Sequence, residues 1–139
     1  MASLPLDNLT RTGQLKIEPP AQAEIDGLVR SGLARLRDAQ NASLSIESRF
    51  DLAYNAAHAL SLAVLRRHGY RSENRYLVFQ TLIHTTALEN AQWRIFDQAH
   101  RKRNLAEYEG DLDVDEALVE SLIRVTKLLA ERTQTLDPP

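Results

Sequence analysis

The segment HRKRNLAEYEG, residues 100–110, holds the residue types of this sequence that could do chemistry together. Three consecutive cations, Arg101, Lys102 and Arg103, are followed by an amide, and a phenol at Tyr108 stands between two carboxylates. Adjacent Lys and Arg side chains attract anions, and phosphate groups above all. The segment therefore predicts a local basic patch.

A second group of basic residues stands at the end of the helix predicted over residues 45–69. Five basic residues stand at its end or just beyond it: Arg66, Arg67, His68, Arg71 and Arg75. If this helix end lies near residues 100–103, the combined charge focuses into a site of phosphate size, even though the chain has a formal net charge of −2. The alternative is a solvated polar face with pairs four residues apart, such as Arg103 with Glu107.

The histidines do not form a metal site by spacing. The sequence has four of them, His58, His68, His84 and His100, with no pair four residues apart and no Cys to support them. His58 lies in an Ala-rich helix and is expected to be a hydrogen-bonded core residue. The acidic residues between 111 and 116 suit helix capping better than a calcium loop. No metal and no cofactor is expected.

The apolar residues recur mostly at spacings of three and four, which is typical of helices. The pattern predicts helices over 21–39, 45–69, 75–85, 86–110 and 113–136, of which the third would also suit a strand. The helix over 45–69 is small or apolar around most of its circumference, so it is expected at the centre. Thr86 and Glu89 match a capping box at the start of the fourth helix. The predicted fold is an all-α, up-and-down bundle of four to five helices with short connections.

Residues 1–20 are expected to be a separate N-terminal segment outside the bundle domain of residues 21–136. Pro5, Pro19 and Pro20 disfavour helix in the residues before them, so the segment is predicted to be an extended arm packed on the domain. A frayed terminus is the alternative.

Composition places limits on the class of protein. The chain has 139 residues, of which 43% are hydrophobic and 26% charged, as in ordinary globular domains. It has no Cys, which fits a reducing cytoplasm. Its first residues lack the cationic and then apolar pattern of a signal peptide, and its longest apolar run, 52–65, is too short to cross a bilayer. We therefore expect a soluble cytoplasmic protein with no membrane partner.

Two stretches, SRFDLAYNAAHAL at 48–60 and RKRNLAEYEG at 101–110, resemble the prokaryotic HEPN superfamily. The resemblance covers the chain from the second predicted helix to the last. It implies a helical bundle that forms a homodimer. Many members are metal-independent endoribonucleases with an R-N-x-x-x-H motif, whose Arg and His act on RNA across the dimer interface. Others are toxins paired with a nucleotidyltransferase-type antitoxin, and others again have lost catalysis.

Matched to that motif, Arg103 takes the place of the Arg, Asn104 that of the polar residue after it, and Tyr108 that of the His. The resemblance implies that Arg103 steadies the phosphate and Asn104 orients it. A phenol with a pKa of about 10 is a poor base at neutral pH, whereas imidazole at about 6.5 suits the role. Residues five apart are separated by about 140° on a helix, so Arg103 and Tyr108 converge only if the helix distorts or a second protomer contributes.

Three hypotheses follow. In the first, the domain binds RNA or a nucleotide phosphate without catalysis, through a basic groove at a homodimer interface. In the second, it is a metal-independent endoribonuclease or toxin in which Tyr108, or an imported His58 or His100, handles protons. In the third, it is a helical dimerisation or protein-interaction module. The first two share one predicted site: Arg103, Asn104 and Tyr108 for the chemistry, with Arg101, Lys102, Arg67, Arg71, His58 and His100 for binding.

Overall fold

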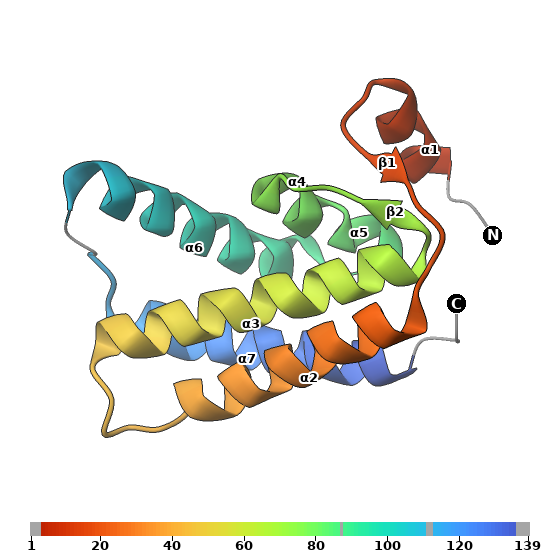
Figure 1. Ribbon diagram of the computed structural model, residues 1–139. Helices are drawn as coiled ribbons and strands as arrows, with labels where there is room; N and C mark the ends of the chain where they lie inside the picture. Colours follow the sequence, from red (N-terminus) through yellow and green to blue (C-terminus); the bar gives the residue numbers. More distant parts are fainter. Residues whose placement is uncertain (1–3, 87, 111–112, 136–139) are drawn as a thin grey trace.

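The computed structural model describes residues 4–86, 88–110 and 113–135. Four long helices dominate the described residues: α2 (Gln22–Ala39), α3 (Ile46–Arg67), α6 (Asn90–Glu109) and α7 (Glu116–Thr135). The shorter elements are α1 (Leu4–Arg11), β1 (Lys16–Ile17), β2 (Tyr70–Arg71), α4 (Arg75–Gln80) and α5 (Leu82–Thr85). Figure 1 shows α3 in the middle, with α2 and α7 along one side and α4 and α6 along the other. The prediction of an all-α bundle is confirmed.

Helix α3 can lie at the centre because it carries small residues around much of its circumference. Ala53, Ala56, Ala57, Leu60 and Ala63 are fully buried, so neighbouring helices approach its backbone from several sides. The predicted ends are confirmed: the Ser45 side chain accepts a hydrogen bond from the amide of Ser48, and Gly69 takes a left-handed φ of 88° after the last turn.

The N-terminal segment is not the extended arm that its prolines suggested. Residues Leu4–Arg11 form a helix with Pro5 in its first turn. The N–H groups of a first turn have no acceptor within the helix, so the missing N–H of proline costs no hydrogen bond there. Only the part after this helix is extended, and β1 pairs there antiparallel with β2. Leu6 and Leu15 are buried in a small second core with Leu65 and Tyr70.

The chain between α3 and α6 is helical but broken. The predicted helix over 75–85 is divided at Thr81, and β2 occupies part of what was expected to be a loop. The predicted capping box at Thr86 is wrong: the Thr86 hydroxyl donates back to the carbonyl of Leu82 and closes the preceding turn. Glu89 is the N-cap of α6, in a capping box with Gln92.

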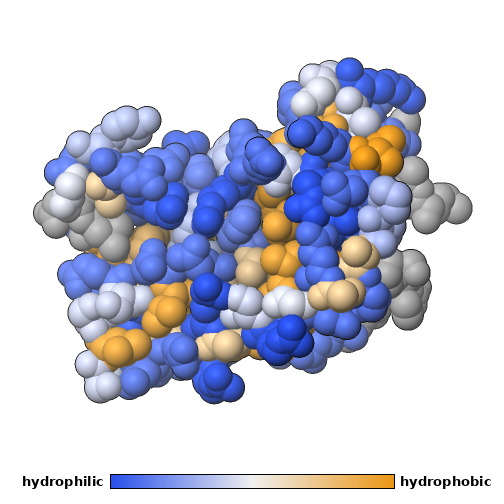
Figure 2. Space-filling view, in the orientation of Figure 1, coloured by the Kyte–Doolittle hydropathy of each residue, from blue (hydrophilic) through white to orange (hydrophobic). Residues whose placement is uncertain are grey.

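The start of α7 is capped as the acidic residues before it indicated. The Asp115 carboxylate accepts a hydrogen bond from the amide of Leu118 at 2.8 Å. Of the other acidic residues before α7, Asp111 lies outside the described residues. No helix among the described residues combines the length and apolar character needed to cross a membrane. In Figure 2, hydrophilic residues dominate the face drawn, and the hydrophobic ones form separate small groups.

Candidate phosphate-binding site

One face of α6 carries His100, Arg103, Asn104 and Glu107, at helical spacings of three and four. This face turns toward α3, where the Arg103 guanidinium lies over the Tyr54 ring with its carbon 5.1 Å from the ring centroid. Arg103 also forms an ion pair with Glu107 at 3.0 Å. The predicted pair of Arg103 with Glu107 is therefore confirmed, and Arg103 in addition lies over the ring of a neighbouring helix.

A second cation reaches the same ring from α4. The Arg75 guanidinium carbon lies 5.7 Å from the Tyr54 centroid, and Nη1 donates to Asn55 Oδ1 at 3.1 Å. Arg75 has no carboxylate partner among the described residues. Two cations from different helices therefore converge on one aromatic ring, and a carboxylate balances only one of them.

His100 is held in place at both ring nitrogens. Its Nδ1 lies 2.9 Å from the Tyr54 hydroxyl, and its Nε2 lies 3.1 Å from Asn104 Nδ2. An amide nitrogen only donates, so the neutral ring accepts at Nε2 and carries its proton on Nδ1, which donates to the Tyr54 oxygen. Asn104 thus fixes the orientation and tautomer of His100.

His58 has more freedom than His100. It is partly buried one turn beyond Tyr54 on α3, with its ring edge-on to Phe79 at 6.0 Å, and makes no hydrogen bond to another described residue. The prediction of a hydrogen-bonded core histidine was therefore wrong. Burial, together with the charges of Arg75, Arg103 and His100, lowers the pKa of His58 to about 4. The imidazole is neutral at neutral pH.

The same two causes act on the neighbours of His58. Burial, and then the charge of Arg103, lower the pKa of His100. Burial raises the pKa of Tyr54, although the charges of Arg103 and Arg75 oppose that shift. Both imidazoles and the phenol are therefore uncharged at neutral pH, and the charges of this cluster are those of Arg75, Arg103 and Glu107.

Aromatic rings form the base of the cluster. Phe79 is buried and stacks on Phe96 at 5.4 Å, and its ring also meets Tyr54 and His100 edge-on. The centroid of the Tyr76 ring lies 5.4 Å from that of His100 and 6.4 Å from that of Trp93. The buried Nε1 of Trp93 has no hydrogen-bond partner among the described residues. These rings fix the positions of the polar groups above them.

The structure does not bring Tyr108 to Arg103 within one chain. The Tyr108 side chain is 88% exposed, whereas Arg103 is partly buried against α3. Helix α6 runs unbroken through both residues, so the separation of about 140° expected for positions five apart is kept. Tyr108 can approach an Arg103 only from another protomer.

Arg101 and Lys102 also lie outside the cluster. Arg101 is exposed and pairs with Asp97, four residues earlier, at 3.3 Å. Lys102 Nζ lies 3.6 Å from Asp113. These two cations belong to the solvated polar face that was the alternative interpretation of the basic segment.

Arg67 and Arg71 lie at the opposite end of α3. Arg67 is thirteen residues after Tyr54, about 20 Å along the helix, and donates to the carbonyl of Thr133 in α7. Arg71 pairs with Glu18 and Glu24. The condition that the end of α3 lies near residues 100–103 is not met for Arg67 and Arg71, because α3 and α6 run in opposite directions (Figure 1). Of the basic residues beyond α3, Arg75 does reach the ring over which Arg103 lies.

Of the predicted residues, the structure brings together His58, His100, Arg103 and Asn104, and it adds Tyr54, Arg75 and Phe79. Arg75 was named in the second basic group, whereas Tyr54 and Phe79 were not singled out. The spacing of four between Tyr54 and His58 places them on one face of a helix, but no local pattern indicated which member of the second basic group would reach that face. The described residues contain no group of three or more His, Asp or Glu side chains placed to hold a metal ion.

Comparison with known proteins finds no match: no family model, no curated protein and no solved structure is similar to this chain.

Proposed function

We propose that the cluster formed by Tyr54, His58, Arg75, His100, Arg103 and Asn104 binds the phosphate groups of RNA. The proposal is supported above all by Arg75, a guanidinium with no described carboxylate partner, directed at the same ring as Arg103. Guanidinium groups match phosphate oxygens in two-point hydrogen bonds. Aromatic faces next to cations are also what a single-stranded base stacks on.

The environment strengthens binding of an anion. The site is partly buried, so charges interact there more strongly than in water. Because both imidazoles are neutral, the two arginines keep a net charge of about +1 after Glu107 is counted. A bound phosphate would stabilise the protonated form of His58 and raise its pKa. Binding and protonation of His58 are thus linked.

The proposed assembly is a homodimer in which α6 lies near the two-fold axis. The exposed ring of Tyr108 supports this arrangement, because a large aromatic side chain with 88% of its surface in solvent is suited to an interface. In such a dimer, the partner's Tyr108 takes the place beside Arg103 that this chain's own Tyr108 cannot reach.

Fluorescence anisotropy with single-stranded RNA tests the proposal. We expect the double change Arg75→Gln and Arg103→Gln to weaken binding about tenfold or more and to lower the slope of log K against log salt by about 1 to 1.5. The matched control, Arg94→Gln with Arg124→Gln, removes the same charge from exposed positions on α6 and α7. Equal losses in the two double variants would show that RNA binds by general attraction rather than at the cluster.

A metal-independent ribonuclease is the second candidate. The observation that favours it is the imidazole of His58, neutral and without a described hydrogen-bond partner beside Arg103. A neutral imidazole next to a bound phosphate is able to accept the proton of a ribose hydroxyl. Incubation of the protein with cellular RNA in excess chelator, beside His58→Gln, Arg103→Ala and Tyr108→Phe, distinguishes the two candidates. Cleavage lost in the His58 and Arg103 variants supports the enzyme; retained RNA binding without cleavage supports the binding module.

A further inference from the structure

A groove of about 760 Å³ lies between α2 and α7, on the side of α3 away from the phosphate cluster. Its α2 wall is made by residues that recur at three and four along the helix, from Gln22 to Arg37. The adjoining face of α2, with Ile25, Leu36 and Ala39, is buried against the core. This stretch of α2 therefore has one packed face and one face that no described element covers fully.

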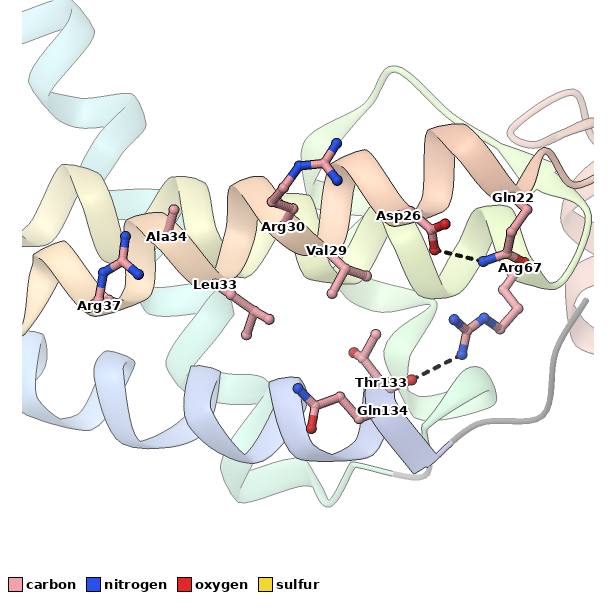
Figure 3. Close-up of a pocket in the computed structure, with 10 residues that line it drawn as sticks. All are labelled: Gln22, Asp26, Val29, Arg30, Leu33, Ala34, Arg37, Arg67, Thr133 and Gln134. Carbon is pink, nitrogen blue, oxygen red and sulfur yellow. Dashed lines mark hydrogen bonds between the residues drawn. The ribbon is translucent and has the colours of Figure 1, made fainter.

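The floor of the groove is apolar. Val29 and Leu33 are partly buried, pack on the main core, and point from α2 toward α7 in Figure 3. Ala34 lines the same groove and leaves room above the backbone. Val29 and Leu33 are one helical turn apart, and such a row of apolar residues is what an amphipathic partner helix packs its own apolar residues against.

The charge at the edge of the groove is mostly positive. Arg30, Arg37 and Arg67 line it, against the single carboxylate of Asp26. Arg30 has no ion pair among the described residues, and the pair between Arg37 and Asp38 is exposed and 3.9 Å long. Arg67 and Arg37 mark the two ends of the groove and Arg30 lies between them (Figure 3). The cations thus follow its whole length.

From these observations we infer that the groove is a docking site for an acidic amphipathic helix of a partner protein. The α2 wall spans sixteen residues, about 22 Å from the first to the last, which matches roughly four turns of a helix and is longer than a small ligand. Apolar residues of the partner fill the floor, and its carboxylates meet the arginines along the groove. This inference is independent of the proposed function, since the two sites share no residue.

A synthetic peptide of about 18 residues serves as the probe, with Leu along one helical face and Glu on both flanks; a second peptide carries Lys in place of each Glu. Anisotropy should show saturable binding of the Glu peptide, about tenfold tighter than binding of the Lys peptide. Arg30→Glu with Arg37→Glu should reverse this preference. Arg35→Glu with Arg124→Glu changes the net charge equally at exposed positions outside the groove, and should leave the preference unchanged.

Amide chemical shifts locate the bound peptide, and changes centred on Val29, Leu33 and Ala34 support the inference. Three outcomes would overturn it. One is a Glu peptide that does not bind saturably, and another is a preference that the Arg30 and Arg37 changes fail to reverse. The third is a wild-type dimer, seen by sedimentation, that the same double change converts to a monomer, because a second copy of the chain would then occupy the groove.

Discussion

A single side chain, His58, links the stability of this fold to pH. In an unfolded chain an imidazole has a pKa of about 6.5, whereas in the fold burial and nearby cations lower the pKa of His58 to about 4. Below pH 6.5 the unfolded chain therefore binds more protons at this residue than the folded one. The stability that neutral His58 contributes is fully present above pH 6.5 and is lost as the pH falls toward 4.

We expect the free energy of unfolding to fall by about 2 kcal/mol between pH 7.5 and pH 5 through His58 alone. Urea unfolding at a series of pH values measures this change. Carboxylates titrate in the lower part of the same range, so His58→Gln is the reference. The variant should have a flatter dependence than the wild type between pH 6.5 and 5, and identical curves would contradict the assigned pKa.

The sequence indicated which residues of α6 belong to the candidate site, but it did not indicate which residues of other helices contact them. Arg103, Asn104 and His100 share one helical face, and that much follows from their spacing. The contribution of Arg75 depends on how α4 crosses α3, which no local pattern encodes. Tyr108 was grouped with Arg103 through a family motif, although the helical geometry of one chain separates them.

At the level of the elements, α2 packs tightly against α3 at Gly32. A Cβ atom at this position would lie 2.8 Å from Leu60 Cγ, so the glycine allows the two helices to touch. By helix propensity alone, Gly27 and Gly32 weaken the helix predicted over 21–39 equally. They differ because only Gly32 faces α3.

These two glycines form a matched pair. Gly32→Ala should destabilise the fold by about 1–3 kcal/mol, since the added methyl group has to displace Leu60 or part α2 from α3. Gly27→Ala should stabilise it by about 0.5–1 kcal/mol, since its Cβ would meet only the end of Arg30 at 3.8 Å. Thermal or urea unfolding of both variants checks the signs. A stabilising change at Gly32 would show that the helices are less tightly packed than described.

Across the whole molecule, one buried arginine joins distant parts of the chain. The Arg66 side chain is 1% exposed and donates to the carbonyls of Glu18 and Pro19 and to the Glu24 carboxylate. Hydrogen bonds from Arg66 and Arg71 hold the pKa of Glu24 below its ordinary value. Through this network, the segment between β1 and α2 is fixed to the end of α3.

Arg66→Met should cost about 2–4 kcal/mol of stability, because it leaves carbonyl groups near the core without donors. Arg35→Met, at an exposed position of α2, is the control and should change stability by less than about 0.5 kcal/mol. Hydrogen exchange should also become faster in β1 and β2 of the Arg66 variant. If exchange there is unchanged, Arg66 does not hold the segment.

The overall class and the long helices were predictable, since apolar periodicity and caps such as Ser45 are local signals. The N-terminal segment was not, because its helix and its pairing with β2 depend on Leu6, Leu15 and Arg66, which meet only in the folded chain. The membership of the candidate site was predicted only in part for the same kind of reason. The antiparallel run of α3 and α6 leaves Arg67 and Arg71 far from Arg103, whereas Arg75 reaches it from α4.

The position of Trp93 has a practical consequence for spectroscopy. It is the only tryptophan of the chain, its indole nitrogen is buried, and it touches Tyr76, which in turn touches His100. The indole nitrogen is thus shielded from water, although the residue as a whole is only partly buried, and the ring adjoins the cluster. We expect the emission of this internal fluorophore to change when a ligand binds at that cluster, without any added dye.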